Sequence, residues 1–331
     1  MKYANSFLIG NGFDVNLGLK TRYAEFYEYY LNIPTDKDNI KNLKLHLKEN
    51  RSDFWSDLEI GLGKYTANLS SYEQVEEAYD DINDEMKKYI SDIDNLPLPQ
   101  DINVDLFKKN ISSLESFLSP AETNRIKALY SRLSIANHII DIVNFNYTIT
   151  VDKILGYETK RIEIAPAAYN NSYKTFINSI FHIYGTTEDP ILGVDNVSQI
   201  SNKELVEQGD ISDYLVKPLI NTTIGYLIDE KAKNAILNAD LICIYGMSLG
   251  ETDTTWWKFI GERLLKGTTV ILYIYDGDAN NLVARKKEKF NKKWRKKFFD
   301  VAGISESKRL ELEKKLIIAP NTKIFDIRTN S

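Results

Sequence analysis

The sequence predicts an α/β fold: a doubly wound, mainly parallel sheet with a large helical insertion. Several strand-like segments are near-continuous apolar runs, which are typical of strands covered by helices on both faces. Long segments of helical pattern lie between such runs, as in proteins with parallel sheets. The first apolar run passes directly into Gly10 and Gly12, and strands of nucleotide-binding sheets often end in this way.

Seven short apolar runs are expected to form the strands of this sheet. They are residues 6–10, 139–145, 161–165, 178–184, 240–245, 269–276 and 323–327.

The segment between the first two strands, residues 24–137, is far longer than a crossover connection needs and has a largely helical pattern. We expect it to be a helical insertion packed beside the sheet, within a single domain that covers residues 1–331. The stretch "NLPLPQD" (95–101) divides the insertion into two parts. A second helical stretch covers residues 202–238.

The composition is that of an ordinary globular protein, with 331 residues of which 43% are hydrophobic and 27% charged. No apolar run approaches the roughly 20 residues that span a bilayer, and the first residues do not resemble a signal peptide. A cytoplasmic location without membrane contact is therefore expected. The single cysteine, Cys243, lies in an apolar run and is expected to pack in the core. One cysteine excludes a disulfide framework and a cysteine-based zinc site.

The net charge of −5 does not favour nucleic acid as a partner, but the charge is unevenly spread. Residues 285–297 hold nine cations and one anion. Because Val283, Phe290, Trp294 and Phe298 approximate helical spacing, we expect an amphipathic helix whose solvated basic face is dispensable for nucleotide binding. A contact with phosphate or nucleic acid is the alternative.

The segment "LIGNGFDVNLGLKTRY" (8–23) raises the first question of function. Its Gly10-x-Gly12 turn suits a site where a phosphate approaches the backbone closely. The next glycine is Gly18, so the spacing differs from the GxGxxG dinucleotide fingerprint. A tight turn between a strand and a helix explains the same residues, and both interpretations stay open.

Polar residues also follow three later strands, at the edge where doubly wound sheets bind ligands. Asn146 lies in "NFNYT", His182 in "HIYGT", and Ser248 and Asp253 in "YGMSLGETD". Each has a structural alternative. Asn146, Ser248 and Asp253 suit helix caps, and His182 suits a partly buried histidine with satisfied hydrogen bonds.

These segments resemble two groups of proteins. The opening "GNGFDVNLGLKTRY" is similar to the Gly-x-Gly turn and Gly-Leu pair of sirtuins, "NFNYT" to the sirtuin segment with the catalytic asparagine, and "HIYG" to the sirtuin His-Gly segment. More closely, the chain resembles the AbiH family of phage abortive-infection proteins. The motifs that carry this likeness are, in order, Asn-Gly-Phe-Asp with Gly-Leu-x-Thr-x-Tyr, "WSDLE", "NFNYT", "HIYG", "ILG" and "YGMSLGETD".

The resemblance implies a sirtuin-like Rossmann domain in a phage-defence protein that binds NAD and hydrolyses its nicotinamide-ribose bond, without a metal. Asn146 would orient the attacking water, and a neutral His182 would accept a proton. The glycine turn would take the pyrophosphate. The residues implied in NAD binding are Gly10, Asn11, Gly12, Asp14, Gly18, Tyr23, Tyr184, Gly246, Ser248 and Asp253.

The match departs from the sirtuin pattern at several positions. Tyr184 directly precedes the glycine, where sirtuins have histidine, and His182 lies two residues earlier. Since residues i and i+2 of a strand share a face, His182 is expected to reach the site from about 6 to 7 Å further back. Whether His182 or Tyr184 acts as the base stays open. Thr148 replaces an aspartate, and Tyr23, next to Arg22, replaces an arginine. The four-cysteine zinc module is absent, which argues against a deacylase.

Two other functions fit the sequence. In a non-catalytic module, the sheet edge would sense a nucleotide and the insertion would bind a partner; Tyr184 favours this, whereas Asn146 favours hydrolysis. An effector directed at nucleic acid would use the basic helix, but no carboxylate and histidine cluster with metal-site spacing supports it. The expected partners are NAD or a related nucleotide, a phage protein as trigger, and a second copy of the chain.

Overall fold

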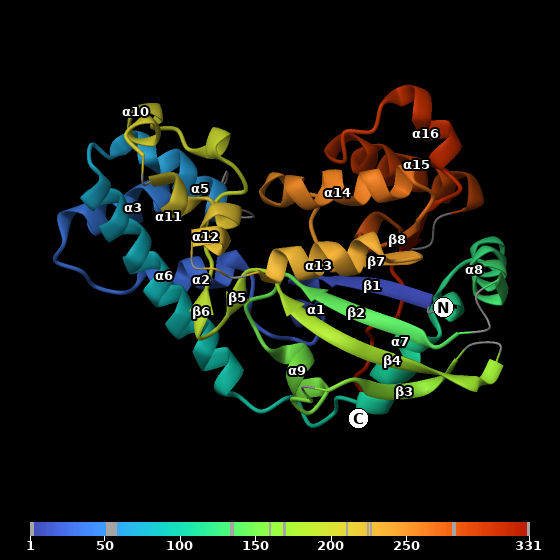
Figure 1. Ribbon diagram of the computed structural model, residues 1–331. Helices are drawn as coiled ribbons and strands as arrows, with labels where there is room; N and C mark the ends of the chain where they lie inside the picture. The colour runs from blue at the N-terminus through green and yellow to red at the C-terminus, as the bar shows by residue number, and fades with distance from the viewer. Residues whose placement is uncertain are drawn as a thin grey trace.

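The computed structural model describes residues 3–50, 58–132, 136–158, 160–167, 170–209, 211–223, 225, 227–279 and 283–329. Figure 1 shows a central sheet with helices above and below it, and a group of helices to one side. Within the described residues, no helix is long and apolar enough to cross a membrane.

The central sheet has seven strands in the order β3-β4-β2-β1-β7-β8-β9. Neighbouring strands are parallel except for the edge pair β3 and β4. Without β3, this is the strand order of doubly wound dinucleotide-binding folds, and the order reverses between β1 and β7. The strands are β1 (Tyr3–Ile9), β2 (His138–Asn144), β3 (Ile162–Ala167), β4 (Asn170–His182), β7 (Leu241–Tyr245), β8 (Thr269–Ile274) and β9 (Leu316–Pro320).

Both faces of the sheet are buried, which explains the continuous apolar runs in the sequence. In β1, Leu8 packs into the core on one face, whereas Phe7 and Ile9 pack into the core on the other. In β7, Ile242 and Cys243 divide in the same way. Cys243 is fully buried, as expected.

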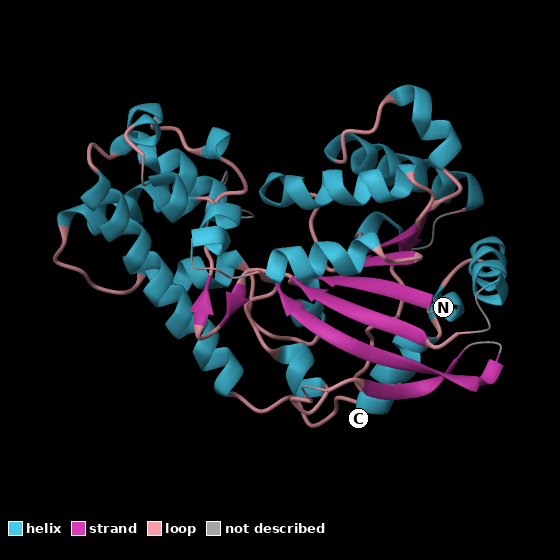
Figure 2. Cartoon of the chain, in the orientation of Figure 1, coloured by secondary structure: helices cyan, strands magenta, loops and turns pink. Residues whose placement is uncertain are grey.

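Helices cover each face of the sheet (Figure 2). One core is closed by α13 (Ile228–Leu237), α14 (Thr254–Leu265), α15 (Ala284–Val301) and α16 (Glu306–Leu312). The opposite core is closed by α1 (Gly12–Asn16), α7 (Val104–Ser112), α8 (Pro120–Arg132) and α9 (Thr150–Ile154).

A third core lies beside the sheet, in a group of helices that we call the helical unit. It consists of α2 (Tyr23–Leu31), α3 (Asp38–Glu49), α5 (Leu58–Tyr65), α6 (Tyr72–Asn95), α10 (Lys203–Glu207), α11 (Ile211–Leu215) and α12 (Lys217–Thr223). The longest helix, α6, begins at Ser71, whose side chain accepts a hydrogen bond from Gln74 N–H. It ends before Leu96-Pro97, because a proline disfavours the helical conformation of the preceding residue.

Segment 24–137 therefore contributes to two places. Its described helices before residue 95 lie in the helical unit, whereas α7 and α8, after the break at 95–101, cover the sheet. The short elements are η1 (Thr66–Asn68), η2 (Leu114–Phe117), η3 (Val197–Gln199), η4 (Glu251–Asp253), η5 (Gly277–Ala279), β5 (Gly185–Thr186) and β6 (Asp189–Pro190).

The strand expected over 323–327 is wrong; the last strand is β9. Ile324, Phe325 and Ile327 are fully buried, and Phe325 packs edge-on against Phe13 with ring centroids 5.1 Å apart. An apolar run indicates that its residues are buried. Here the buried residues belong to a loop that folds over the sheet without pairing with it. The other six predicted strands overlap strands of the structure.

Candidate functional site

A cavity of about 370 Å³ lies at the carboxyl ends of β1, β2 and β7, where the strand order reverses. This is where doubly wound sheets bind ligands, and the volume lies in the range of small-molecule sites. The helical unit closes the cavity from the side with residues of α2 and α6 and with Glu59 of α5.

Most of the residues predicted for the site line this cavity. They are Gly10, Asn11, Asp14, Tyr23, Asn146, Tyr184, Gly246, Ser248 and Asp253. Gly12, Gly18 and His182 do not line it. The tertiary structure thus brings together residues that are spread over some 240 positions of the sequence.

The glycines of the first turn allow the loops after β1 and β7 to cross in close contact. A Cβ atom on Gly12 would lie 2.5 Å from the Cα atom of Gly246, and one on Gly10 would lie 2.8 Å from the Gly246 carbonyl oxygen. Gly246 itself has a φ of +70°, which favours glycine. The loops after β1 and β7 can touch only because these positions have no side chain.

Three amides of this turn already donate hydrogen bonds within the protein. Gly10 N–H donates to the Tyr245 carbonyl (2.9 Å), Gly12 N–H to Gly246 (2.7 Å), and Phe13 N–H to Gly10 (2.9 Å). The expectation that these amides take a pyrophosphate is therefore corrected, because backbone carbonyls occupy them. The glycines hold the site together and do not present these N–H groups to a ligand.

Substituting Gly12 with alanine should destabilise the protein, because the new methyl group meets backbone atoms that cannot move aside. We expect a loss of about 1–3 kcal/mol in the free energy of unfolding, measured by thermal or urea denaturation. Gly277→Ala is the matched control, since nothing lies within 4 Å of the added Cβ atom. Equal stability of the two variants would contradict the proposed role of Gly12.

Asp14 is a buried carboxyl group in the lining of the cavity. Its side chain is fully buried, and its Oδ2 atom accepts a hydrogen bond of 2.5 Å from the Thr148 hydroxyl. Among the described residues, its Oδ1 atom has no hydrogen-bond partner. Burial raises the pKa of Asp14 to about 7, and the hydrogen bond from the Thr148 hydroxyl opposes that rise. The carboxyl group can therefore take up or release a proton near neutral pH.

Asn146 lies beside Asp14 and is 5% exposed. Neither atom of its side-chain amide has a partner within the described part of the chain. Its backbone N–H donates to Asn144 Oδ1 (3.1 Å), so the turn is held while the side chain stays available. Asn146 does not cap α9, because the N-cap residue is Ile149. A buried amide without partners can bond to a ligand or to an ordered water.

His182 does not reach the cavity, and the expected shared face with Tyr184 is wrong. Strand β4 ends at His182, and after it Ile183 is buried and the chain turns. His182 Nε2 lies 3.0 Å from Asp152 Oδ2, and its Nδ1 atom lies 3.3 Å from Asn144 Nδ2. Since Asn144 also accepts the Asn146 N–H, His182 contacts the turn that carries Asn146 and not the cavity itself.

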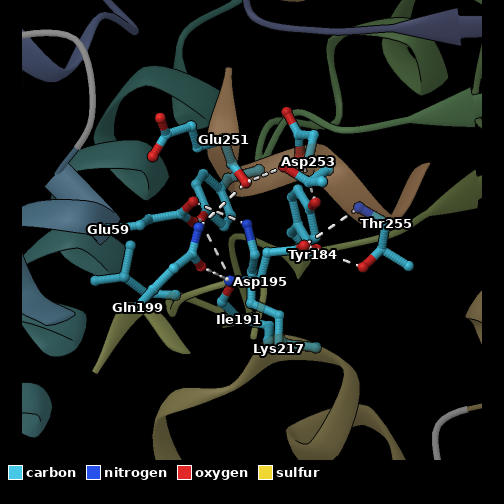
Figure 3. Close-up of polar contacts among 12 residues, drawn as sticks. Glu59, Tyr184, Ile191, Asp195, Gln199, Lys217, Glu251, Asp253 and Thr255 are labelled. Atoms are coloured by element: carbon cyan, nitrogen blue, oxygen red, sulfur yellow. Dashed lines mark hydrogen bonds and ion pairs between the residues drawn. The ribbon is translucent and has the colours of Figure 1, made fainter. Parts of the chain in front are cut away.

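Beneath the cavity, Lys217 and Glu59 form a buried ion pair of 2.8 Å (Figure 3). Both side chains are nearly inaccessible, at 2% and 4% exposure. Lys217 Nζ also lies 3.8 Å from the ring centroid of Tyr184, and the Tyr184 hydroxyl donates to Asp253 at 2.5 Å. Burial alone would lower the pKa of Lys217, but Glu59 and Asp253 raise it, so the lysine stays charged.

The same network continues toward α14. Thr255 donates to Asp195 through both its N–H (3.2 Å) and its hydroxyl (3.0 Å). Gln199 accepts the Asp195 N–H (2.7 Å) and donates to the Glu251 carbonyl (3.2 Å). Figure 3 shows these contacts around Tyr184 and Lys217. They connect η3 and the helical unit to the elements that follow β7.

A comparison with protein families decides what kind of protein carries this site. The sequence model of the family described as "Bacteriophage abortive infection AbiH" matches residues 6–275. The chain belongs to the AbiH family. The match includes every residue that lines the cavity, and the family description suggests a role in abortive infection by phage. No curated protein sequence gives a significant match.

The AbiH motifs quoted above account for residues that the sequence analysis did not place in the site. Glu59 ends the motif "WSDLE", of which Trp55 to Asp57 lie outside the described residues. Tyr147 belongs to "NFNYT", and its hydroxyl donates to Glu59 Oε1 at 3.0 Å. The motifs thus contained Glu59 and Tyr147, but the structure was needed to show what these residues contact.

The sequence motifs did not single out three other residues that line the cavity of this AbiH protein. Arg22 directly precedes α2, Phe26 lies within α2, and Tyr89 lies in α6; together they form the wall that faces the sheet. No group of three or more histidine, cysteine, aspartate or glutamate side chains in the described ranges is arranged to hold a metal ion.

Proposed function

We propose that this AbiH-family protein acts in phage abortive infection by binding NAD in the cavity and hydrolysing its nicotinamide-ribose bond. The observation that carries the proposal is the pair formed by Asn146, a buried amide without partners, and Asp14, a buried carboxyl group that titrates near neutral pH. The sirtuin-like motifs of the sequence support the choice of NAD. The position at the reversal of strand order supports a nucleotide ligand.

The walls of the cavity suit such a substrate. Tyr23, Tyr89 and Tyr147 offer aromatic faces on which a nicotinamide or adenine ring can stack. Arg22 brings a guanidinium group to the rim, where it is half exposed and can meet a phosphate. In this proposal Arg22 and Ser248, and not the amides of the glycine turn, contact the pyrophosphate.

The proposed reaction needs one oriented water and one proton acceptor. The bond between ribose C1′ and the nicotinamide nitrogen breaks, and its electron pair stays on nicotinamide, which leaves uncharged. The amide of Asn146 orients a water whose oxygen bonds to C1′, and Asp14 accepts the proton that this water loses. The products are nicotinamide and ADP-ribose, and Asp14 passes the proton to solvent. The walls of the cavity shield the electron-poor ribose from much of the surrounding water.

A second candidate function is a non-catalytic nucleotide sensor. The buried network from Asp253 and Tyr184 to Lys217 and Glu59 favours it, because a ligand above Tyr184 would contact the side chains that join the sheet to the helical unit. Such a ligand would shift the position of the helical unit without being consumed.

One experiment separates the two functions. The purified protein is incubated with NAD, and nicotinamide release is followed over time, while calorimetry measures NAD binding. Release supports hydrolysis, and binding without release in both purified protein and phage-infected cells supports the sensor. The infected cells are included because effectors of this kind often stay inactive until triggered. Absence of binding in every condition would refute both functions.

The variant Asn146→Ala should lower the hydrolysis rate by a factor of about 100 or more, or about 2.7 kcal/mol of activation free energy. Its melting temperature should change little, because the amide makes no hydrogen bond with the described part of the protein. His182→Ala should reduce the rate less, since His182 acts through Asn144. A loss confined to His182→Ala would show instead that His182 is the base.

A further inference from the structure

Helix α15 (Ala284–Val301) has two sharply different faces. Phe290, Asn291, Arg295, Phe298 and Phe299 are buried, and the three phenylalanines belong to the core above the sheet. The opposite face is exposed and basic. Its exposed cations are Arg285, Lys286, Lys287, Lys289, Lys292, Lys293, Lys296 and Lys297. We call these eight residues the basic face.

None of the eight side chains pairs with an acidic side chain among the described residues. The one acidic residue in this stretch, Glu288, lies 3.3 Å from the buried Arg295. Asp300, at the end of the helix, pairs with Arg309 at 2.7 Å. Lys297 contacts the Trp294 ring, with its Nζ atom 5.1 Å from the centroid. The positive charge of the basic face is therefore not neutralised by carboxylates of the described protein.

This arrangement lowers the stability of the helix. Lys289 lies four residues from both Arg285 and Lys293, and like charges at this spacing repel by roughly 0.2–0.5 kcal/mol per pair. The pairs Lys292 with Lys296 and Lys293 with Lys297 repeat the pattern. The first turn contains no acidic residue and holds three cations, the opposite of what the helix dipole favours. Helix stability therefore does not explain why these charges are here.

We propose that the basic face binds the phosphate backbone of a double-stranded nucleic acid. Positions 285 to 297 span about 18 Å along the helix axis. Phosphates of one duplex strand are spaced 3.4 Å apart along the duplex axis, so the basic face matches about five of them. Phosphates would remove the repulsion between the lysines and would also meet the positive end of the helix dipole. Because the surface contacts backbone only, we expect no preference for base sequence.

A nucleic acid fits this surface better than an anionic membrane does. Amphipathic helices that lie on membranes bury their apolar face between the lipids. In α15 that face is already buried in the protein, as Phe298 and Phe299 show at 0% and 3% exposure. Only charge attraction would remain for a membrane, whereas a duplex presents its phosphates at regular spacing along a rigid rod.

The test measures binding of a fluorescent 20-base-pair DNA duplex by anisotropy at a series of KCl concentrations. The variant carries Lys292→Gln, Lys293→Gln, Lys296→Gln and Lys297→Gln. The control carries Lys48→Gln, Lys87→Gln, Lys266→Gln and Lys323→Gln, four exposed lysines elsewhere with the same change in net charge. Wild type and control should bind alike. The variant should bind at least tenfold more weakly, and its log-log salt slope should be shallower by about two or more.

Two outcomes would overturn the proposal. If variant and control lose the same affinity, the binding reflects net charge and not this surface. If the duplex does not bind the wild type while vesicles rich in phosphatidylserine do, the surface faces a membrane. Nicotinamide release, measured in parallel, should be equal in all three proteins, since none of the substituted residues lines the cavity.

Discussion

Asp14→Asn is expected to reduce NAD hydrolysis at pH 7.5 by at least 100-fold while making the protein more stable at that pH. The rate falls because the amide cannot accept a proton from water, and general base catalysis typically contributes a factor of about 10²–10⁴. In the wild type, the pKa of Asp14 is raised to about 7, so the rate should rise about tenfold per pH unit below pH 7 and level off above it.

The gain in stability follows from the same burial. The pKa of Asp14 is about 7 in the folded protein and near 3.8 in the unfolded chain, so the folded state prefers the protonated form. As the pH rises from about 4 to 7, the unfolded chain loses its proton first and folding becomes less favourable. The wild type loses about 4 kcal/mol over this range through Asp14 alone. The amide that replaces the carboxyl group in the variant carries no such charge, so this part of the decline should disappear.

Urea denaturation at pH 5 and pH 8, together with rates of nicotinamide release, checks both effects. Asp36→Asn is the control, since Asp36 is exposed and lies outside the cavity. It should leave both the rate and the pH dependence of stability unchanged. If Asp14→Asn keeps full activity, Asp14 is not the base. If the stability of the variant declines with pH as in the wild type, Asp14 does not cause the decline, and burial does not raise its pKa.

Lys217→Met is expected to cause the largest loss of stability of the substitutions considered, about 3–5 kcal/mol. Removing the ammonium leaves Glu59 charged, buried and without its partner at 2.8 Å. The double variant Glu59→Gln with Lys217→Met removes both charges, and the new side-chain amide can still accept the hydrogen bond from the Tyr147 hydroxyl. We therefore expect the double variant to be more stable than Lys217→Met.

Lys88→Met provides the comparison. Its ion pair with Glu85 is short, at 2.6 Å, but the lysine side chain is 63% exposed. Exposed pairs contribute about 0–1 kcal/mol, because water solvates both charges when the pair is broken. If Lys217→Met costs no more than Lys88→Met in urea denaturation, the buried pair between α5 and α12 contributes no more to stability than an exposed pair.

The buried pair also has a consequence for regulation of the proposed activity. Tyr147 and Tyr184 line the cavity, and both contact the Glu59 and Lys217 pair. A protein that bound the helical unit and shifted α5 or α12 would move these rings. In the function proposed above, a phage protein bound there would act on the cavity through Glu59, Lys217, Tyr147 and Tyr184.

Much of the fold could be predicted from the sequence because strands buried on both faces have apolar residues at almost every position. The apolar runs of β1, β2, β7 and β8 predicted these strands, and the basic amphipathic pattern predicted α15. The loop at 323–327 shows the limit of this reasoning, since its apolar residues are buried without strand pairing.

The sequence by itself determined six of the seven strands, the family and the segments that meet at the sheet edge, including Asn146. Only the tertiary structure decided what each residue does there. Gly12 lies against Gly246, because the two loops cross at backbone distance. His182 turns toward Asp152, because its strand ends at that residue. Asp14 titrates near neutral pH, because residues far away in the sequence bury it, and burial is a property of the packed protein that no local pattern contains.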